Sequence, residues 1–123
     1  MRALVLLTSI VVGACAQPAS IPTPRSPTAE VLIDDYTFTP QMIEVTVGTR
    51  VRWVNKDQLT HTVTNSPSAE VPLKPDRTYD LDVARFNLTL DGGTEAVLDF
   101  SARGTYYYYC LPYNWMRGVV VVR

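Results

Sequence analysis

The last twenty residues, GTYYYYCLPYNWMRGVVVVR, constrain the fold of this chain more than any other stretch. Residues 105–109 and 119–122 are β-branched or aromatic, and such residues fit a pleated, half-buried surface. Gly104 and Gly118 precede these two runs, as expected for turns. The segment therefore predicts two strands joined by a tight loop, and at least one face of each strand must belong to a core.

The loop between these strands combines two sulfur side chains, with Cys110 at its start and Met116 near its end. A soft thiolate and a soft thioether so close together suit copper better than magnesium or calcium, which prefer oxygen ligands. A blue copper site adds imidazole to such a pair, with the methionine as a long axial ligand. His61 is the only histidine in the chain, so any imidazole must come from there.

The remaining chain is also patterned for strands. Alternation of apolar and polar side chains predicts strands near residues 31–33, 43–47, 51–53, 61–63, 79–83, 86–90 and 96–100. Residues 34–40 and 65–76 are polar or proline-rich and are expected to form connections, and no segment predicts a helix. Seven or eight short strands separated by turn signals predict an all-β Greek-key sandwich or barrel.

Two stretches together resemble a known family: GTRVRWVNKDQLTHTVT, which contains His61, and the loop from Cys110 to Met116. Residues 31–123 resemble the cupredoxins, the plastocyanin, azurin and amicyanin family of small copper proteins, and the loop has the short, amicyanin-like length. The resemblance implies the same Greek-key fold, one copper ion, and His61, Cys110 and Met116 as ligands. In the family the loop reads Cys, two residues, His, then Met, whereas this chain has Tyr113 at the histidine position.

Tyr113 leaves three outcomes open for the metal site. A phenol with a pKa near 10 binds metal poorly at neutral pH unless the metal displaces its proton. Tyr113 could bind as phenolate and give a more tetragonal Cu(II) site of lower potential. It could turn away and leave a position open to water, or leave a three-coordinate His, Cys, Met pocket that prefers Cu(I). The hydroxyl groups of Thr60 and Thr62, which flank His61, could orient the imidazole or the thiolate.

These features favour a one-electron carrier with an atypical copper site. The alternatives are a Cu(I) carrier or sequestration protein, and a metal-free interaction module with the same fold. The chain offers no paired carboxylates and no Ser/His/Asp set with suitable spacing, so we expect no enzyme; red-copper oxidase or reductase chemistry is the one enzymatic alternative. The apolar loop residues around Tyr113 are expected to meet a redox partner or a copper donor or acceptor, unless Trp115 caps the barrel. These residues are Leu111, Pro112, Tyr113 and Trp115.

The N-terminal residues predict export and a lipid anchor. Residues 1–14 combine Arg2 with an apolar run too short to span a bilayer, as in a secretory signal. The sequence VGAC, ending at Cys15, resembles the bacterial lipobox, and an ordinary signal peptide is the alternative. Lipidation of Cys15 would leave Cys110 unpaired and in need of protection in an oxidising compartment. Residues 15–29 would then be a Pro/Ser-rich tether that anchors domain 30–123 to the extracytoplasmic face of a membrane.

Charge excludes one class of partner. Removal of residues 1–14 takes away a single arginine and leaves ten basic and twelve acidic residues. The consecutive tyrosines, which alternate between the two faces of their strand, are expected to serve packing rather than electron relay. A slightly acidic domain of this size is not a strongly basic nucleic-acid binder.

Overall fold

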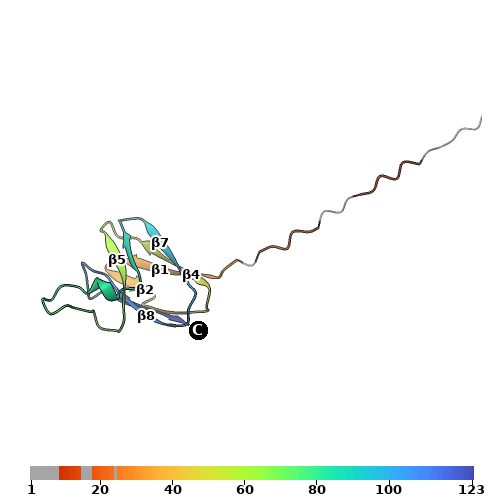
Figure 1. Ribbon diagram of the computed structural model, residues 1–123. Coiled ribbons are helices and arrows are strands. Elements are labelled where there is room, and N and C mark those ends of the chain that lie inside the picture. Colours follow the sequence, from red (N-terminus) through yellow and green to blue (C-terminus); the bar gives the residue numbers. More distant parts are fainter. Residues whose placement is uncertain (1–8, 15–17, 24) are drawn as a thin grey trace, which may run out of the picture.

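Two sheets packed face to face form the domain in the computed structural model, which describes residues 9–14, 18–23 and 25–123 (Figure 1). The strands are β1 (Thr28–Asp34), β2 (Thr37–Thr39), β3 (Met42–Val45), β4 (Thr49–Asn55), β5 (His61–Ser66), β6 (Asn87–Leu90), β7 (Glu95–Phe100), β8 (Gly104–Tyr109) and β9 (Arg117–Val122). One sheet has the order β2-β1-β4-β7 and the other the order β3-β9-β8-β5-β6. The predicted all-β sandwich is confirmed, with nine strands in the described residues.

Both sheets are mixed. β1 pairs with β4 in parallel and β3 pairs with β9 in parallel, while the other pairings are antiparallel. The antiparallel pairing of β5 with β8 is the one that matters for the site, because it aligns the start of β5 with the end of β8. Residues far apart in the sequence therefore meet at one end of the sandwich.

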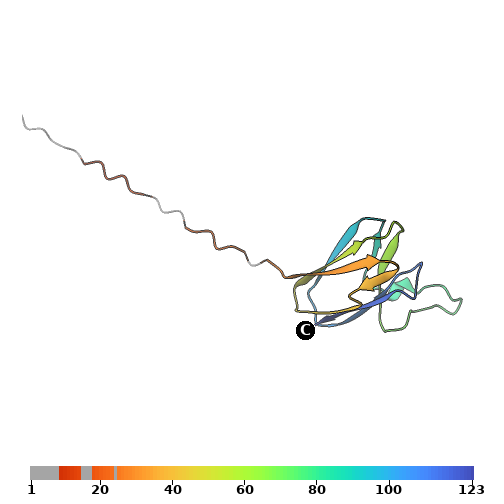
Figure 2. The ribbon, with the colours of Figure 1, turned by 180° about the vertical axis from the view of Figure 1, so that it is seen from behind.

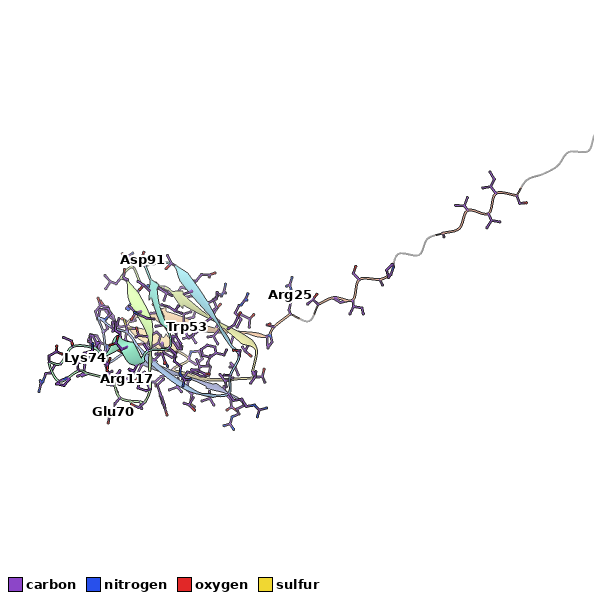
Figure 3. The ribbon with its side chains drawn as sticks, in the orientation of Figure 1. Arg25, Trp53, Glu70, Lys74, Asp91 and Arg117 are labelled. Atoms are coloured by element: carbon purple, nitrogen blue, oxygen red, sulfur yellow. The ribbon has the colours of Figure 1, made fainter. Side chains whose placement is uncertain are left out.

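Aromatic side chains fill the space between the sheets. Trp53, at the centre of β4, is fully buried and lies inside the sandwich (Figure 3). Its ring packs edge-on against Tyr108 with centroids 5.6 Å apart, and Phe100 lies 6.3 Å away. Such aromatic pairs each contribute about 0.5–1.5 kcal/mol beyond the burial of their surface. The aromatic core therefore packs directly against β8, the strand that Cys110 follows.

The two ends of the sandwich have different roles. β1 enters at Thr28 beside Arg50, and the C-terminal Arg123 hydrogen-bonds to Val47 at the same end. The described residues before Thr28 extend away from that end (Figures 1 and 2). β1 and β4 each span seven residues, or about 23 Å, so the loops after them lie at the opposite end. We call that opposite end, which carries His61 and Cys110, the metal pole.

Two predictions about individual segments are wrong. Residues 79–83 were expected to form a strand, but Leu81–Val83 is a 3-10 helix whose first turn is capped by the Asp80 side chain. Their alternation does not reflect burial, because Leu81 and Val83 are both exposed. Residues 34–40 were expected to be a connection, but they contain β2, whose Phe38 is buried in the core.

The described residues contain no helix long and apolar enough to cross a membrane. The predicted lipid attachment site, Cys15, and residues 1–8 of the predicted signal lie outside the described residues. The division of the chain into signal, tether and domain therefore stays a prediction.

Candidate metal centre

His61 and Cys110 come together at the metal pole. His61 opens β5 and Cys110 directly follows β8, so the antiparallel pairing of these strands brings the two residues side by side. Nδ1 of His61 lies 3.7 Å from Sγ of Cys110, and both side chains are fully buried. The imidazole and the thiol that the sequence singled out are thus neighbours, although 49 positions separate them.

Met116 lies at the same pole, on the other side of a tight loop. The Cys110 N–H donates to the Met116 carbonyl at 3.1 Å, and the Met116 N–H donates to the Tyr113 carbonyl at 2.9 Å. The Met116 side chain is 2% exposed and belongs to the same buried cluster as Cys110. These two backbone hydrogen bonds close the loop and hold both sulfur-bearing residues at its base.

Asp57 fixes the orientation of the imidazole. Nε2 of His61 lies 2.7 Å from Oδ2 of Asp57, which leaves Nδ1 facing Cys110. The backbone N–H groups of Asp35 and Tyr36 donate to the same carboxylate at 2.8 and 3.2 Å. Histidine ligands of metals usually make such a hydrogen bond through their second nitrogen, and it sets the tautomer. Sequence reasoning missed Asp57, and only its position four residues before His61 could have pointed to it.

The same contacts set the charge of Asp57. Burial by itself raises the pKa of this carboxyl group. The hydrogen bonds from the N–H groups of Tyr36 and Asp35, and then the contact with His61, lower the pKa by more than burial raises it. The net pKa lies below the ordinary value of an aspartate. Asp57 is therefore a carboxylate at neutral pH and can accept a hydrogen bond from Nε2 of His61.

Cys110 sits in a pocket suited to a bound thiolate. Burial raises the pKa of its thiol, while the N–H groups of Thr62 and Tyr113 and the Thr62 hydroxyl partly offset that rise. The Thr62 N–H donates to Sγ at 3.3 Å. A metal cation deprotonates a coordinating thiol outright, so the raised pKa does not prevent binding. A buried sulfur that already has N–H donors, next to a free imidazole nitrogen, fits a soft metal such as copper.

Tyr113 packs beside the imidazole as part of an aromatic cluster. Its ring centroid lies 5.3 Å from that of His61, 4.9 Å from that of Tyr36 and 5.4 Å from that of Trp115. Tyr36 also meets His61 edge-on at 5.7 Å. Tyr113, at the position where the family has a second histidine, is therefore close to His61, and its aromatic ring covers the imidazole.

The two threonines beside His61 behave differently. The Thr62 hydroxyl accepts a hydrogen bond of 2.8 Å from the N–H of Leu111, in the metal loop. The Thr60 hydroxyl instead donates to Asp91, in the turn after β6. Of the two hydroxyl groups proposed from the sequence, only that of Thr62 reaches the site.

The outer surface of the metal pole is partly apolar. Trp115 is 65% exposed, so it does not cap the barrel, and Tyr36 and Leu59 are also exposed. Next to Met116 lies a cavity of about 190 Å³. It is lined by Tyr36, Thr37, Phe38, Gln41, Trp115, Met116 and Arg117. Tyr36 and Trp115 thus form an exposed aromatic rim at the pole that holds the buried histidine and sulfur groups.

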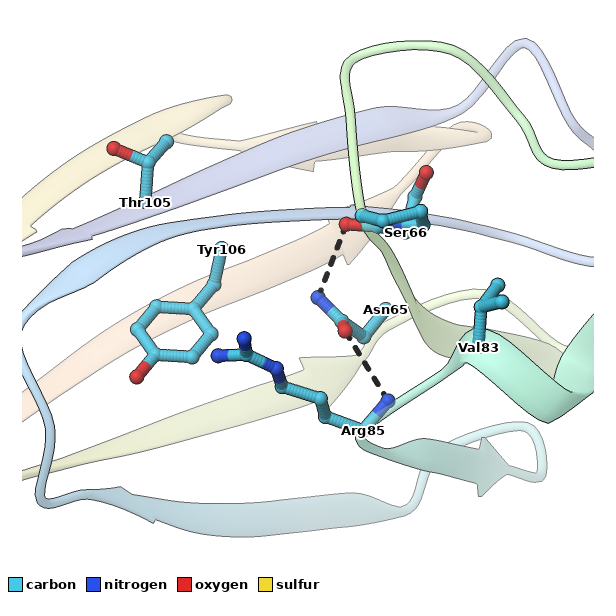
Figure 4. Close-up of a pocket in the computed structure, with 7 residues that line it drawn as sticks. Asn65, Ser66, Val83, Arg85, Thr105 and Tyr106 are labelled. Atoms are coloured by element: carbon cyan, nitrogen blue, oxygen red, sulfur yellow. Dashed lines mark hydrogen bonds between the residues drawn. The ribbon is translucent and has the colours of Figure 1, made fainter.

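A second cavity, of about 200 Å³, lies beside β5 and the first half of β8, and the residues that line it hold the fold together (Figure 4). The Asn65 amide at its wall donates to the carbonyls of Ser66 and Tyr107 and accepts from the N–H of Arg85. The Arg85 guanidinium lies over the Tyr106 ring, 5.7 Å from its centroid. These internal contacts tie the chain after β5 to the sheet and leave the Asn65 amide no role in the metal centre.

The tyrosines of β8 act as packing residues, as predicted. Tyr106 and Tyr108 lie in the core, and Tyr109 is buried on the other face beneath Tyr79. Burial raises the pKa of Tyr108 to about 12. A phenol that holds its proton so firmly is poorly suited to a relay that requires proton loss.

Comparison with known proteins identifies the family of this chain. Copper binding proteins of the plastocyanin/azurin family match residues 28–123. Amicyanin from Paracoccus denitrificans is 29% identical over 139 residues, an alignment that covers 99% of this chain and 92% of amicyanin. The structure of a reduced amicyanin mutant superposes with a TM-score of 0.63 at 25% identity, covering 81% of this chain and 86% of that one. A purple cupredoxin from Nitrosopumilus maritimus gives 0.59 at 25% identity, covering 77% and 99%.

Proposed function

Because the chain belongs to the plastocyanin/azurin family of copper-binding proteins, we propose that it carries single electrons on one copper ion at the metal pole. One observation carries the proposal: buried Nδ1 of His61 lies 3.7 Å from buried Sγ of Cys110. Bond lengths of about 2.0 Å to nitrogen and about 2.3 Å to sulfur, in tetrahedral geometry, separate two ligand atoms by about 3.5 Å. This spacing supports ligation of one ion by both atoms, and we propose Met116, buried in the same cluster, as the third ligand.

The protein's contribution is a rigid, dry site. Bound copper supplies one-electron exchange between Cu(II) and Cu(I). Asp57 holds the imidazole in one tautomer, and the N–H of Thr62 holds the sulfur in place. Because these groups are buried and anchored to strands, they keep one arrangement in both oxidation states, and water is excluded as an extra ligand. A small change in geometry lowers the barrier to electron exchange.

We propose that Tyr113 covers the site rather than binding the metal. In a histidine side chain, Nδ1 lies two bonds from Cβ, whereas the phenol oxygen of tyrosine lies five bonds away. A loop that places a histidine Nδ1 on the metal would therefore carry a phenol oxygen past it. The contacts of the Tyr113 ring with Tyr36 and Trp115 also favour a covering role. The expected site has three protein ligands.

A Cu(I) carrier or sequestration protein is the second candidate, because a histidine, a thiolate and a thioether without a second histidine form a soft ligand set. The two candidates differ in the stability of the oxidised state. Electron transfer requires a reversible Cu(II)/Cu(I) couple, whereas delivery requires only tight Cu(I) binding.

We further propose that the exposed aromatic rim, with Trp115 at its centre, receives a redox partner or a copper donor. The tether enters at the opposite end of the sandwich, so a lipid on Cys15 would leave this rim accessible to a partner. Twelve residues lie between Cys15 and Thr28, which allows at most about 45 Å of reach. The domain could thus meet partners on the extracytoplasmic side.

Copper titration followed by optical spectroscopy and voltammetry tests the proposal. We expect a thiolate-to-Cu(II) absorption band and a reversible couple in the wild-type protein, and neither in Cys110→Ser. Tyr113→His should shift the spectrum toward that of ordinary blue copper. A wild-type protein that binds Cu(I) tightly but gives no band and no couple would favour the carrier, and one that binds no copper would refute both candidates.

A further inference from the structure

A chain of side-chain hydrogen bonds leads from the metal loop to the edge strand β6. The Leu111 N–H donates to Oγ1 of Thr62 at 2.8 Å, and this hydroxyl lies 2.9 Å from Oγ1 of Thr64. The Thr64 hydroxyl in turn lies 2.9 Å from Oδ1 of Asn87, which stands directly opposite it in the β5–β6 ladder. Three side chains thus connect the residue after Cys110 to the outer edge of the sheet.

The direction of this chain is set at its outer end. A carbonyl oxygen only accepts hydrogen bonds, so the Thr64 hydroxyl donates its one proton to Asn87. In its contact with Thr62, the Thr64 hydroxyl can then only accept a hydrogen bond. The Thr62 hydroxyl must therefore donate its proton to Thr64. Asn87 itself is exposed, but Thr62 is 7% exposed and Thr64 is fully buried, so water has little access to the two hydroxyl groups.

The proton of Thr62 has an alternative acceptor. The Thr62 backbone N–H already donates to Sγ of Cys110 at 3.3 Å, so this residue lies directly beside the sulfur. The Thr62 hydroxyl lies close to the same sulfur as well, because it accepts its 2.8 Å hydrogen bond from the N–H of Leu111, the residue bonded to Cys110. While the chain is intact, the hydroxyl proton points to Thr64 and not to the sulfur. A reversal of the chain would add a hydrogen bond to the thiolate.

We propose that Asn87, acting through Thr64, is a positioning residue that keeps the Thr62 hydroxyl proton away from the Cys110 sulfur and so tunes the copper site. The inference rests on the proposed function. Loss of the Asn87 acceptor frees the proton of Thr64 to turn toward Thr62, whose own proton then turns to the sulfur. Hydrogen bonds to a ligand sulfur reduce its donation to the metal and favour the reduced state.

The test compares two substitutions of Asn87. Asn87→Leu keeps the approximate size and removes the acceptor, whereas Asn87→Asp keeps an acceptor oxygen. Thr89→Val is the matched control, because Thr89 lies on the same strand, is exposed and stands opposite Thr62 in the ladder. We expect Asn87→Leu to favour Cu(I) over Cu(II) by about tenfold, which is about 59 mV in reduction potential. The potential should not rise in Asn87→Asp or Thr89→Val.

A second readout needs no copper. In the metal-free protein, the NMR signal of the Leu111 amide reports the hydrogen bond to Thr62, because each bond in such a chain polarises the next. We expect this signal to shift in Asn87→Leu and to stay in place in Thr89→Val. If Asn87→Leu does not fold, Thr64→Val frees the same Thr62 proton, and Thr64→Ser restores its acceptor.

The outcomes distinguish failure of the Asn87 proposal from failure of the proposed copper function. An unshifted Leu111 signal together with an unchanged potential in Asn87→Leu, or in Thr64→Val, overturns the inference while leaving the copper site intact. A wild-type protein without any thiolate band contradicts the proposed function, and with it the tuning of copper. In that case the Leu111 signal still shows whether the directed chain exists.

Discussion

The loop at 110–116 and the excursion at 67–86 flank the same sheet but are held in opposite ways. The short loop has its sulfur side chains buried and its backbone closed by hydrogen bonds at its base. The long excursion, which carries Glu70 and Lys74, projects from the sandwich and exposes apolar side chains (Figures 1 and 3). The loop that carries the proposed sulfur ligands is thus held more tightly than the excursion.

The outer part of the excursion, residues 67–80, makes many of its hydrogen bonds within itself. Ser66 donates to the carbonyl of Glu70, and Asp76 accepts two hydrogen bonds from Thr78. Its ties to the sandwich include the packing of Tyr79 on Tyr109 and a hydrogen bond from Arg117 to the carbonyl of Ala69. We therefore expect substitutions at the metal pole to have larger effects than substitutions in the excursion.

The largest expected effect is loss of the imidazole. His61→Ala removes the only imidazole of the chain and leaves Asp57 without its partner. Cu(I) affinity should fall by more than about 100-fold, since loss of a ligand costs more than loss of a residue that orients one. A competition titration against a chromophoric Cu(I) chelator measures this. Unchanged affinity would mean that His61 is not a ligand, and the Leu81→Ala variant of the excursion serves as control.

Asp57→Asn should have a smaller effect on the same titration. The amide keeps the size of the side chain but no longer provides a charged acceptor for Nε2 of His61. Loss of such orienting partners costs about 10–100-fold in metal affinity. Asp91→Asn is a suitable control, because Asp91 lies at the same pole but contacts Thr60 instead. Equal affinities of the two variants would contradict the positioning role of Asp57.

Gly118→Ala tests how tightly β9 packs against β8 next to the metal loop. A Cβ at this position would lie 2.1 Å from the ring of Tyr108, which β8 places directly opposite. Overpacking of this kind costs about 1–3 kcal/mol in the free energy of unfolding. Urea denaturation of the metal-free protein measures the loss. Leu81→Ala, at an exposed position of the excursion, should stay within about 0.5 kcal/mol of the wild type. A similar loss of stability in both variants would contradict the expected difference between the metal pole and the excursion.

The smallest expected effect is that of Asp76, within the excursion. Hydrogen bonds from the hydroxyl and the N–H of Thr78 lower the pKa of its carboxyl group. A lowered pKa stabilises the fold above the unfolded value of about 3.9, and this contribution is lost as the pH falls below that value. Asp76→Ala should therefore differ slightly from the wild type in thermal unfolding at pH 7 and less at pH 3. A large difference at pH 7 would show that the excursion is essential to the fold.

Patterns of neighbouring residues predicted much of the fold and less of the site. The alternation around Val51 and Trp53 and the aromatic run of β8 reflect real burial, and both strands were predicted correctly. β2 was missed because a three-residue strand with Phe38 as its one core residue leaves almost no pattern. The strand expected at 79–83 failed because alternation alone does not distinguish a buried face from exposed residues in an excursion.

The site depends on contacts that only the folded chain creates. Cys110 and Met116 were recognisable because they lie close together in the sequence, and His61 because it has no competitor. Asp57 was not recognisable, since its role depends on the turn at Asp35 and Tyr36 folding over the loop that precedes β5. The hydrogen-bonded chain ending at Asn87 was hidden for the same reason, because pairing of β5 with β6 creates it.

X-ray absorption spectroscopy of the copper-loaded protein tests the central claim most directly. The account predicts a copper ion with one imidazole nitrogen, one short bond to the sulfur of Cys110 and a longer bond to that of Met116. A His61→Ala variant should lose the imidazole scattering. A spectrum dominated by oxygen ligands, or one whose imidazole signal survives in that variant, would contradict the account.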